Sequence, residues 1–412
     1  MLAHLVYFET LASIEDTSTP AWKSVAAGLV VLRLVDAWLD SGPQVVTTDV
    51  TGLRAIRESI DAISDGDPIR SILRGVVDTL QHAETASITP IASPLLAYGR
   101  ALHYAGQWPL ARDVFDNLVR RATAMGDNEL AVQSSLRLGF VTRRLGDFEA
   151  ADEAYEVAGR IARRSRDAEG NLRALLGHAQ NTIARGNLPA ADEQLADVVH
   201  KAEVAQLTAV LSDALHDRAH LCHLRKDFAA AVRMGYAALE FASDALSRDR
   251  ILGDVAAAFA ELGHLSAARD AHLIVAATTQ EEWLRHQTLI NLMEIAIREG
   301  HEPSFHNYRR LLSNAPLQPY MRAYYHLYAG QGYRTFGHPA NAAAEFHEAM
   351  SVATAHNLNQ LGFVAEAELE RMETPAPPHV APEWPNDLWE IASAIGEMRE
   401  LTTTATKSVG AA

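Results

Sequence analysis

Cysteine, lysine and long apolar runs are scarce in this 412-residue chain. The only cysteine is Cys222, so the chain cannot form an internal disulfide framework or a zinc or iron–sulfur site built from several cysteines. Only four lysines are present, and the formal net charge is −16. Because non-specific binding of nucleic acid requires a basic surface, this charge argues against DNA or RNA as a partner.

The sequence also shows neither a membrane-spanning segment nor a signal peptide. The most apolar stretch, residues 25–39, is short and contains Arg33 and Asp36, whereas a span needs about 20 mostly apolar residues. Residues 1–16 have neither the basic start nor the cleavage pattern of a secretion signal. We therefore expect a cytoplasmic protein without membrane insertion.

Enzyme signatures are absent as well. The chain has no glycine-rich phosphate loop ending in Lys-Ser/Thr, no dinucleotide-binding glycine pattern, no H-E-x-x-H and no G-x-S-x-G. Cys222 falls at a core-facing position of a predicted helix, which favours an inert thiol over a nucleophile. The sequence predicts a protein that is not an enzyme and that holds no cofactor or metal.

Hydrophobic residues, by contrast, make up 48% of the chain, and alanine is abundant. This composition favours helices, because alternating runs of strand type are nearly absent. Within it a turn recurs seven times, at Gly106, Gly146, Gly186, Lys226, Gly263, Gly300 and Gly337. Three steps of 40 residues followed by three steps of 37 indicate an internal repeat.

Each turn has the same neighbours. Seven residues before it stands a small residue in six cases, namely Gly99, Gly139, Ala179, Ala219, Ala256 and Gly330, with Met293 as the exception. Five residues after it stands alanine in six cases and Phe305 in the seventh. Two antiparallel helices approach closely only where facing residues are small, and a turn glycine can end the first helix in a left-handed conformation. The repeat therefore predicts pairs of antiparallel helices.

Two of the second helices carry the series Ala-x3-aromatic-x2-Ala, at Ala151, Tyr155 and Ala158 and at Ala342, Phe346 and Ala349. Together with the small residue and the turn glycine, this series resembles the tetratricopeptide repeat. The steps of 37–40 residues resemble the long variants found in bacterial regulators and signalling scaffolds. The resemblance implies an all-α fold, a right-handed superhelical solenoid of antiparallel helix pairs, and a protein-binding role.

Residues 1–87 lie outside the clear repeats, which occupy residues 88–373. In this N-terminal region we expect helices near 2–14, 20–40, 50–63 and 67–84. They are either degenerate repeats or a cap over the first repeat.

The C-terminal part differs in composition from the repeats. Residues 374–385 contain five prolines and form a linker. Residues 386–412 hold a helix up to about residue 401 and a flexible tail, because the last ten residues are expected to be disordered. We expect everything after residue 374 to be separable from the repeats.

The tetratricopeptide resemblance also implies a binding surface. In that family the first helix of each pair lines a concave groove, and four of its positions meet the ligand. Counted back from each turn, and with adjacent side chains included, the residues here are Arg100, His103, Tyr104, Gln133, Phe140, Arg143, Arg144, Arg173, Gln180, His216, His220, His223, Arg250, Glu294, Tyr324, Gln331 and Arg334. Because guanidinium groups suit carboxylates and aromatic rings, this surface predicts an acidic peptide or partner protein as the ligand.

Three of these residues, His216, His220 and His223, share one face of a single helix, since they are four and three residues apart. Such a face can bind a metal ion, and Asp213 lies one turn earlier. No second element supplies an obvious further ligand, so a stripe of neutral imidazoles is the preferred interpretation. A metal-dependent enzyme that uses this cluster is the least favoured alternative.

The leading hypothesis is a scaffold or sensor that binds a peptide or a partner's helix in the groove. The alternative is a bacterial regulatory module that responds to a ligand or peptide. Because residues 1–87 lack a basic recognition helix, the output of such a module would pass through a partner protein. Neither the partner's identity nor assembly into a homo-oligomer follows from the sequence.

Overall fold

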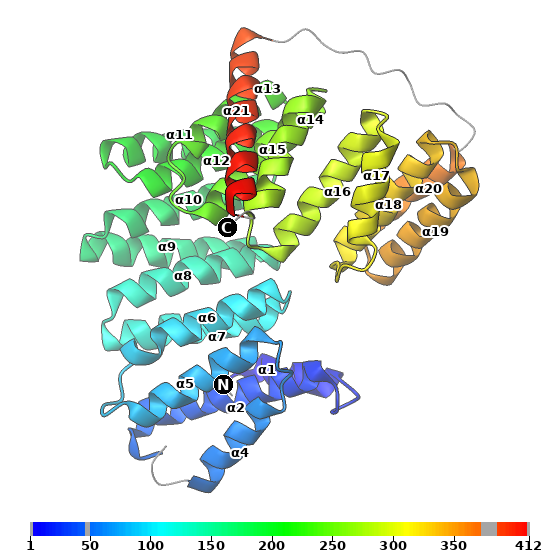
Figure 1. Ribbon diagram of the computed structural model, residues 1–412. Helices are drawn as coiled ribbons and strands as arrows, with labels where there is room; N and C mark the ends of the chain where they lie inside the picture. Colours follow the sequence, from blue (N-terminus) through cyan, green and yellow to red (C-terminus); the bar gives the residue numbers. More distant parts are fainter. Residues whose placement is uncertain (1–2, 46–49, 372–384, 410–412) are drawn as a thin grey trace. The chain divides into compact units, whose positions relative to one another are not determined.

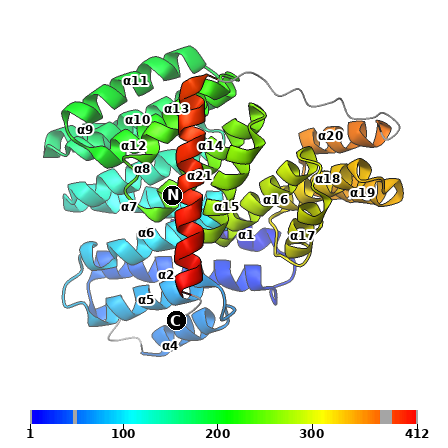
Figure 2. The same cartoon turned by 45° about the horizontal axis from the view of Figure 1, so that its top comes forward.

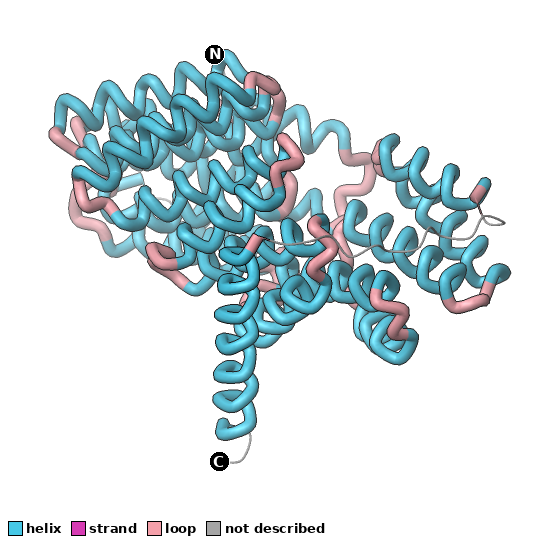
Figure 3. Tube along the Cα trace, turned by 90° about the horizontal axis from the view of Figure 1, so that it is seen from above, coloured by secondary structure: helices cyan, strands magenta, loops and turns pink. Residues whose placement is uncertain are grey.

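The computed structural model describes residues 3–45, 50–371 and 385–409, and within these ranges every regular element is a helix (Figure 3). The all-α fold expected from the sequence is confirmed. Contacts divide the chain into two compact units, residues 1–201 and 202–412. The boundary falls inside α11 (Leu188–Val204).

Each unit is a stack of helices joined by short turns. Unit 1 contains α1 (Leu5–Ser13), α2 (Pro20–Ser41), α4 (Val50–Asp61), α5 (Pro68–His82), α6 (Thr89–Tyr104), α7 (Trp108–Met125), α8 (Asn128–Arg144), α9 (Phe148–Ser165) and α10 (Ala168–Ala184). Unit 2 contains α12 (Thr208–Leu224), α13 (Phe228–Leu239), α14 (Ala245–Glu261), α15 (Leu265–Thr278), α16 (Glu282–Arg298), α17 (Glu302–Leu312), α18 (Pro319–Thr335), α19 (Pro339–Ala355), α20 (Asn359–Glu370) and α21 (Asn386–Val409). From α6 to α10, and again from α12 to α20, each helix packs on the next one in the chain (Figure 1).

The turn between α8 and α9 shows how a pair is joined. Gly146 has a φ of 80°, and its N–H donates to the carbonyl of Arg143. The N–H of Asp147 donates to the carbonyl of Thr142, and the Asp147 side chain then caps the first turn of α9. This is the glycine-terminated helix end that the repeat predicts. Lys226 adopts the same left-handed conformation, with a φ of 60°, where no glycine stands.

The small residues of the repeat lie where large rings pack. Tyr155 of α9 contacts both Gly139 of α8 and Gly177 of α10. A Cβ added to Gly139 would lie 2.6 Å from the Tyr155 ring, and one added to Gly177 would lie 2.3 Å from it. Gly330 and Phe346 repeat this arrangement between α18 and α19, also at 2.6 Å. The alternation of small and large residues is therefore a packing rule of the helix pairs.

The N-terminal helices of unit 1 begin and end within a few residues of the predicted bounds. A buried polar cluster holds the start of α1 against α2 and α7: His4 Nδ1 lies 2.5 Å from Asp113 Oδ2, and His4 Nε2 lies 3.1 Å from Asp36 Oδ2. Burial alone would lower the pKa of His4, but the two carboxylates raise it to about 9. Such buried charges are tolerated because each is paired and hydrogen-bonded.

The C-terminal helix α21 begins at residue 386, as expected, but it is packed on the repeats of unit 2 (Figure 2). Leu388 and Ile395 are fully buried in the same apolar cluster as α13 and α15. The structure therefore differs from the expected separable tail. Spacing along the sequence reveals the apolar stripe of this helix, but it does not reveal the surface that receives the stripe.

The same helix also runs beyond the bound expected from the sequence. It continues to Val409, although the last ten residues were expected to be disordered. Thr402 and Thr403 each donate a hydroxyl hydrogen bond to a carbonyl one turn earlier, which makes these residues compatible with a helix. Most of the expected linker, residues 374–384, lies outside the described residues.

Candidate functional site

The first helices of successive pairs in unit 1 are α6, α8 and α10, and each contacts the next. They carry nine of the residues selected from the sequence: Arg100, His103, Tyr104, Gln133, Phe140, Arg143, Arg144, Arg173 and Gln180. None of these nine side chains is fully buried. We call this surface the first-helix face of unit 1.

Side chains from all three helices meet on this face. The His103 and Phe140 rings pack edge to face, with centroids 4.9 Å apart. The Arg143 guanidinium lies 5.2 Å from the centre of the Phe140 ring, and its Nη2 donates to Gln180 Oε1 at 3.0 Å. The structure thus brings together residues that lie as much as 77 positions apart in the sequence.

An arginine that the sequence analysis did not select lies at the centre of the face. Arg137 of α8 has a lowered pKa because its surroundings are partly desolvated and because Arg100 of α6 and Arg173 of α10 are close to it. We call Arg100, Arg137 and Arg173 the arginine row, since each comes from one of three successive first helices.

Few carboxylates offset this positive charge. Arg173 pairs with Glu169 on its own helix, with Nε 2.8 Å from Oε1. No carboxylate of the described residues lies within 4.0 Å of Arg100, Arg137, Arg143 or Arg144. Fixed positive charges without a local counter-charge attract anionic groups of a ligand.

A pocket of about 520 Å³ opens beside Arg100, between α5 and α6. Its walls are largely apolar and include Ile69, Ile72 and Ala101, while Tyr104 and Asp67 also line it. The Asp67 carboxylate is engaged in capping α5, where it accepts the N–H of Ile69. The Tyr104 side chain is 60% exposed, which is unusual for a large ring. An apolar side chain of a ligand fits such a pocket, while a neighbouring acidic group would reach the arginine row.

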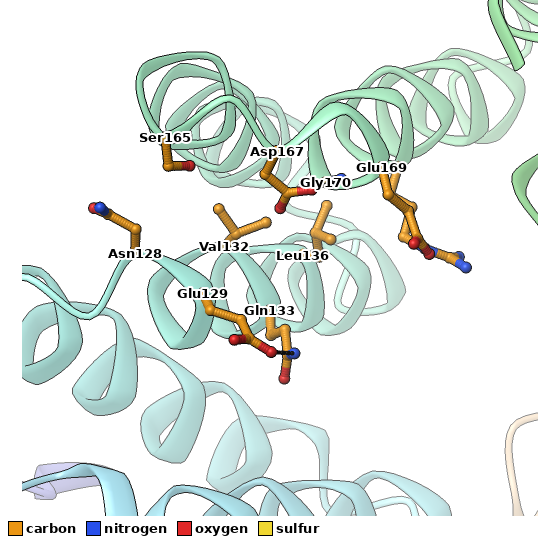
Figure 4. A pocket seen from close by; sticks show the side chains of 10 residues that line it. Asn128, Glu129, Val132, Gln133, Leu136, Ser165, Asp167, Glu169 and Gly170 are labelled. Carbon is orange, nitrogen blue, oxygen red and sulfur yellow. Dashed lines mark hydrogen bonds and ion pairs between the residues drawn. The ribbon is translucent and has the colours of Figure 1, made fainter. Parts of the chain in front are cut away.

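A second pocket of the same volume lies where α8 and α10 begin (Figure 4). Val132 and Leu136 of α8 point toward Asp167 and Gly170 of α10, and Arg173 lines the same pocket. Asp167 already accepts the N–H of Gly170 at 2.8 Å, so this carboxylate is engaged in capping α10. The arginine row therefore extends from an apolar pocket to a more polar one.

The other eight selected residues lie on first helices of unit 2: His216, His220 and His223 on α12, Arg250 on α14, Glu294 on α16, and Tyr324, Gln331 and Arg334 on α18. Here Arg334 has an acidic partner, whereas Arg250 has no carboxylate within 4.0 Å among the described residues. Arg334 Nη1 lies 2.5 Å from Glu368 Oε2, and Gln331 donates to the same carboxylate at 3.3 Å. The charge of Arg334 is therefore offset by Glu368, a carboxylate that sequence counting missed.

In the α16–α18 part of unit 2, Glu294 lies next to Tyr328 and Arg298. Burial raises the pKa of Glu294, and burial together with the Glu294 carboxylate raises the pKa of Tyr328. Tyr328 also stacks on Tyr324, with ring centroids 5.9 Å apart. Arg298 lies 3.6 Å from Glu294, so this region pairs its charges internally.

The three histidines of α12 do not act as one group. His216 Nε2 lies 2.7 Å from Asp254 Oδ2 of α14, whereas the His223 ring packs against Phe228. Burial opposes the charge on His216, but Asp254 more than offsets it and raises its pKa. Among the described residues, no group of three or more His, Cys, Asp or Glu side chains is placed to hold a metal ion. Cys222 is half-buried against the core of unit 2.

The sequence matches no family model and no curated protein. Among solved structures, a Rap protein complexed with competence and sporulation factor shares 9% identity with a TM-score of 0.47, over 85% of this chain and 98% of that one. The apo quorum sensor NprR from B. thuringiensis shares 12% identity with a TM-score of 0.44, over 90% and 92% of the two chains.

A tetratricopeptide repeat protein from Parabacteroides merdae shares 13% identity with a TM-score of 0.41, over 67% of this chain and 98% of that one. These similarities are weak, so the helix pairs themselves define the fold. No helix in the described part of the chain is long and apolar enough to cross a membrane.

Proposed function

We propose that this protein, which is built of tetratricopeptide-like helix pairs, binds an acidic peptide or an acidic segment of a partner protein on the first-helix face of unit 1. The observation that carries this proposal is the arginine row, in which Arg100 and Arg137 have no carboxylate within 4.0 Å among the described residues. A scaffold and a peptide sensor would use this face in the same way.

The arrangement of the row favours a ligand with several carboxylates. Partial desolvation and the charges of Arg100 and Arg173 lower the pKa of Arg137, so Arg100 and Arg137 repel one another in the free protein, while Glu169 partly offsets Arg173. Carboxylates placed among them relieve that repulsion and form charge-assisted, forked hydrogen bonds. The free energy gained by relieving this repulsion adds to the free energy of the new contacts. An acidic ligand therefore binds more tightly than a neutral one.

The apolar pocket beside Arg100 further restricts which ligands fit this face. Ile69, Ile72 and Ala101 offer an apolar wall, and Tyr104 offers an exposed ring. We infer that the ligand places an apolar or aromatic side chain here, next to its acidic residues. A wholly charged polyanion would leave this pocket unfilled and would lose the hydrophobic contribution to binding.

The test is fluorescence anisotropy with three labelled ten-residue peptides: one with alternating Glu and aromatic residues, one with Lys in place of Glu, and one with Gln in place of Glu. The full chain should bind the Glu peptide most tightly. The double variant Arg100→Glu/Arg137→Glu should bind it about tenfold more weakly, because two charge-assisted contacts become repulsive.

A matched control is available on a second helix of the same unit. Arg160 and Arg164 of α9 are exposed, and replacing both with Glu changes the net charge of the protein by the same amount. This control should bind the Glu peptide within about twofold of the wild type. Equal loss of affinity in both double variants would mean that net charge alone governs binding, and the proposed site would be rejected.

A further inference from the structure

The position of α21 in unit 2 is not that of a cap. A helix that caps a repeat array covers the exposed side of the last repeat. Here the last pair is α18 and α19, and α20, which packs on α19, leaves Phe363 69% and Val364 39% exposed. Instead of covering them, α21 packs on α13 and α15, which are second helices well before the end of the array (Figure 2).

α21 packs on these two helices in the way that a bound amphipathic helix packs in a protein groove. Leu388 and Ile395 are fully buried, and Ile391 lies between them on the same side of the helix. A stripe at these spacings is the pattern by which amphipathic helices bind protein grooves. Trp389 lies at the edge of this stripe: it is 53% exposed, and its ring packs on His264 at the start of α15, with centroids 4.7 Å apart. Leu401, farther along α21, is 72% exposed.

Two ion pairs, one before and one after the buried stripe, orient the helix. Asp387, in the first turn of α21, pairs with Arg233 of α13. Arg399, twelve residues later and about 18 Å along a helix, pairs with Asp270 of α15, with Nη1 2.6 Å from Oδ1. The receiving surface thus places a positive group at one end and a negative group at the other, so it accepts a helix in one direction only.

We propose that the surface formed by α13 and α15 is a binding site for an amphipathic helix of a partner protein, and that α21 occupies this site as a tethered competitor. The partner helix would carry an acid in its first turn, Leu or Ile at the positions of Leu388, Ile391 and Ile395, and a basic residue near the position of Arg399. This site lies on other helices than the first-helix face and is independent of the peptide-binding proposal.

One feature favours exchange, and another makes it depend on the affinity of the partner. Both ion pairs are partly exposed, with the Arg399 side chain 42% and the Asp387 side chain 48% accessible, so water can replace them. The helix is joined to the repeats by the proline-rich residues 371–385, and a tethered segment has an effective concentration in the millimolar range. A partner helix must therefore outcompete α21, which makes access to the site conditional.

The probe is a fluorescein-labelled synthetic peptide of residues 385–403, added to the full chain. In the wild type α21 blocks the site, and the peptide should bind weakly. In the full-length variant Leu388→Asp/Ile395→Asp, the native helix cannot dock while the receiving surface is unchanged. We expect the peptide to bind this variant at least about tenfold more tightly than the wild type.

Two controls make the result specific. A peptide that itself carries Leu388→Asp and Ile395→Asp should not bind. Adding Asp270→Arg to the undocked protein should weaken binding of the normal peptide, and a peptide with Arg399→Glu should restore it. If the aspartate variant lowers the melting temperature of the whole protein, the milder charge reversal Asp387→Lys/Arg399→Glu replaces it in the same assay.

Two results would overturn the proposal. An undocked variant that retains its circular dichroism and melting temperature but binds no peptide would show that α21 is a fixed part of unit 2. A dimer of the wild type that grows with concentration and disappears in the undocked variant would identify a second copy of this chain, not a partner protein, as the occupant. Tight binding by the undocked variant, reversed by Asp270→Arg, supports the partner-helix site.

Discussion

Replacing Gly139 with alanine tests the packing rule that defines the repeat. In the interior of α8 this change would ordinarily stabilise the helix by about 1 kcal/mol, because alanine has the higher helix propensity. At Gly139, however, the new Cβ would lie 2.6 Å from Tyr155 Cε1 and 2.8 Å from two further ring atoms. Carbon atoms in contact prefer about 3.5–4.0 Å, so the ring must move by roughly 1 Å.

The Tyr155 ring cannot make that movement freely. On its other side it faces Gly177 of α10, where a Cβ would lie 2.3 Å from the ring. Overpacking of this kind typically costs about 1–3 kcal/mol, which exceeds the gain in helix propensity. We therefore expect Gly139→Ala to lower the free energy of unfolding by about 1–2 kcal/mol. In a unit of this size that lowers the melting temperature by roughly 2–8 °C.

The matched control is Gly75→Ala in α5 of the same unit, where an added Cβ has no neighbour within 4 Å. This variant should be neutral or more stable by up to about 1 kcal/mol, since only the helix propensity changes. Differential scanning calorimetry of both variants gives the comparison. If Gly139→Ala were as stable as Gly75→Ala, the close contact with Tyr155 would not govern the stability of the pair.

Three further outcomes follow from the charges of unit 1. His4→Gln should lower the melting temperature near pH 6, and the difference from the wild type should fade as the pH rises through about 9. The reason is that the pKa of His4 in the folded protein lies above its usual value, so the stabilisation by protonated His4 is complete below about pH 6.5. The triple change of Arg143, Arg144 and Arg173 to Glu should abolish binding of the acidic aromatic peptide, with nearly unchanged circular dichroism. Binding of that peptide to the wild type should weaken between about 0.1 and 0.5 M salt, measured by anisotropy, because exposed charges are screened.

The fold could be predicted from the sequence because the features that determine it are local. A turn glycine such as Gly146 and a small residue such as Gly139 act within one helix pair, and the repeat multiplies each signal. The partners of these residues lie at fixed distances along the chain. For the same reason the helices of the N-terminal region, marked by Pro20 and Pro68 in their first turns, were expected close to their observed bounds.

The candidate site could be predicted from the sequence only in part, because it depends on which side chains pair between different helices. The repeat register selects Arg334 as a ligand contact, but it does not show that Glu368 of α20 neutralises it. It passes over Arg137, which is identified only by its neighbours in space. It also cannot show that His216 faces Asp254 of α14 instead of the histidines of its own helix.

The acidic net charge and the arginine row act at different ranges. At about 0.01 M salt the Debye length is about 30 Å, so an approaching acidic peptide is repelled by a protein with a net charge of −16. At about 0.1 M the Debye length falls to about 10 Å, and close to the first-helix face of unit 1 the arginine row dominates the local field. Because salt screens the row beyond this distance and the net charge of the protein is negative, the attraction of the row is felt mainly at contact, where it slows dissociation. An acidic peptide should therefore associate faster at about 0.1 M than at about 0.01 M salt, unlike the usual case of a ligand steered toward a protein of opposite net charge.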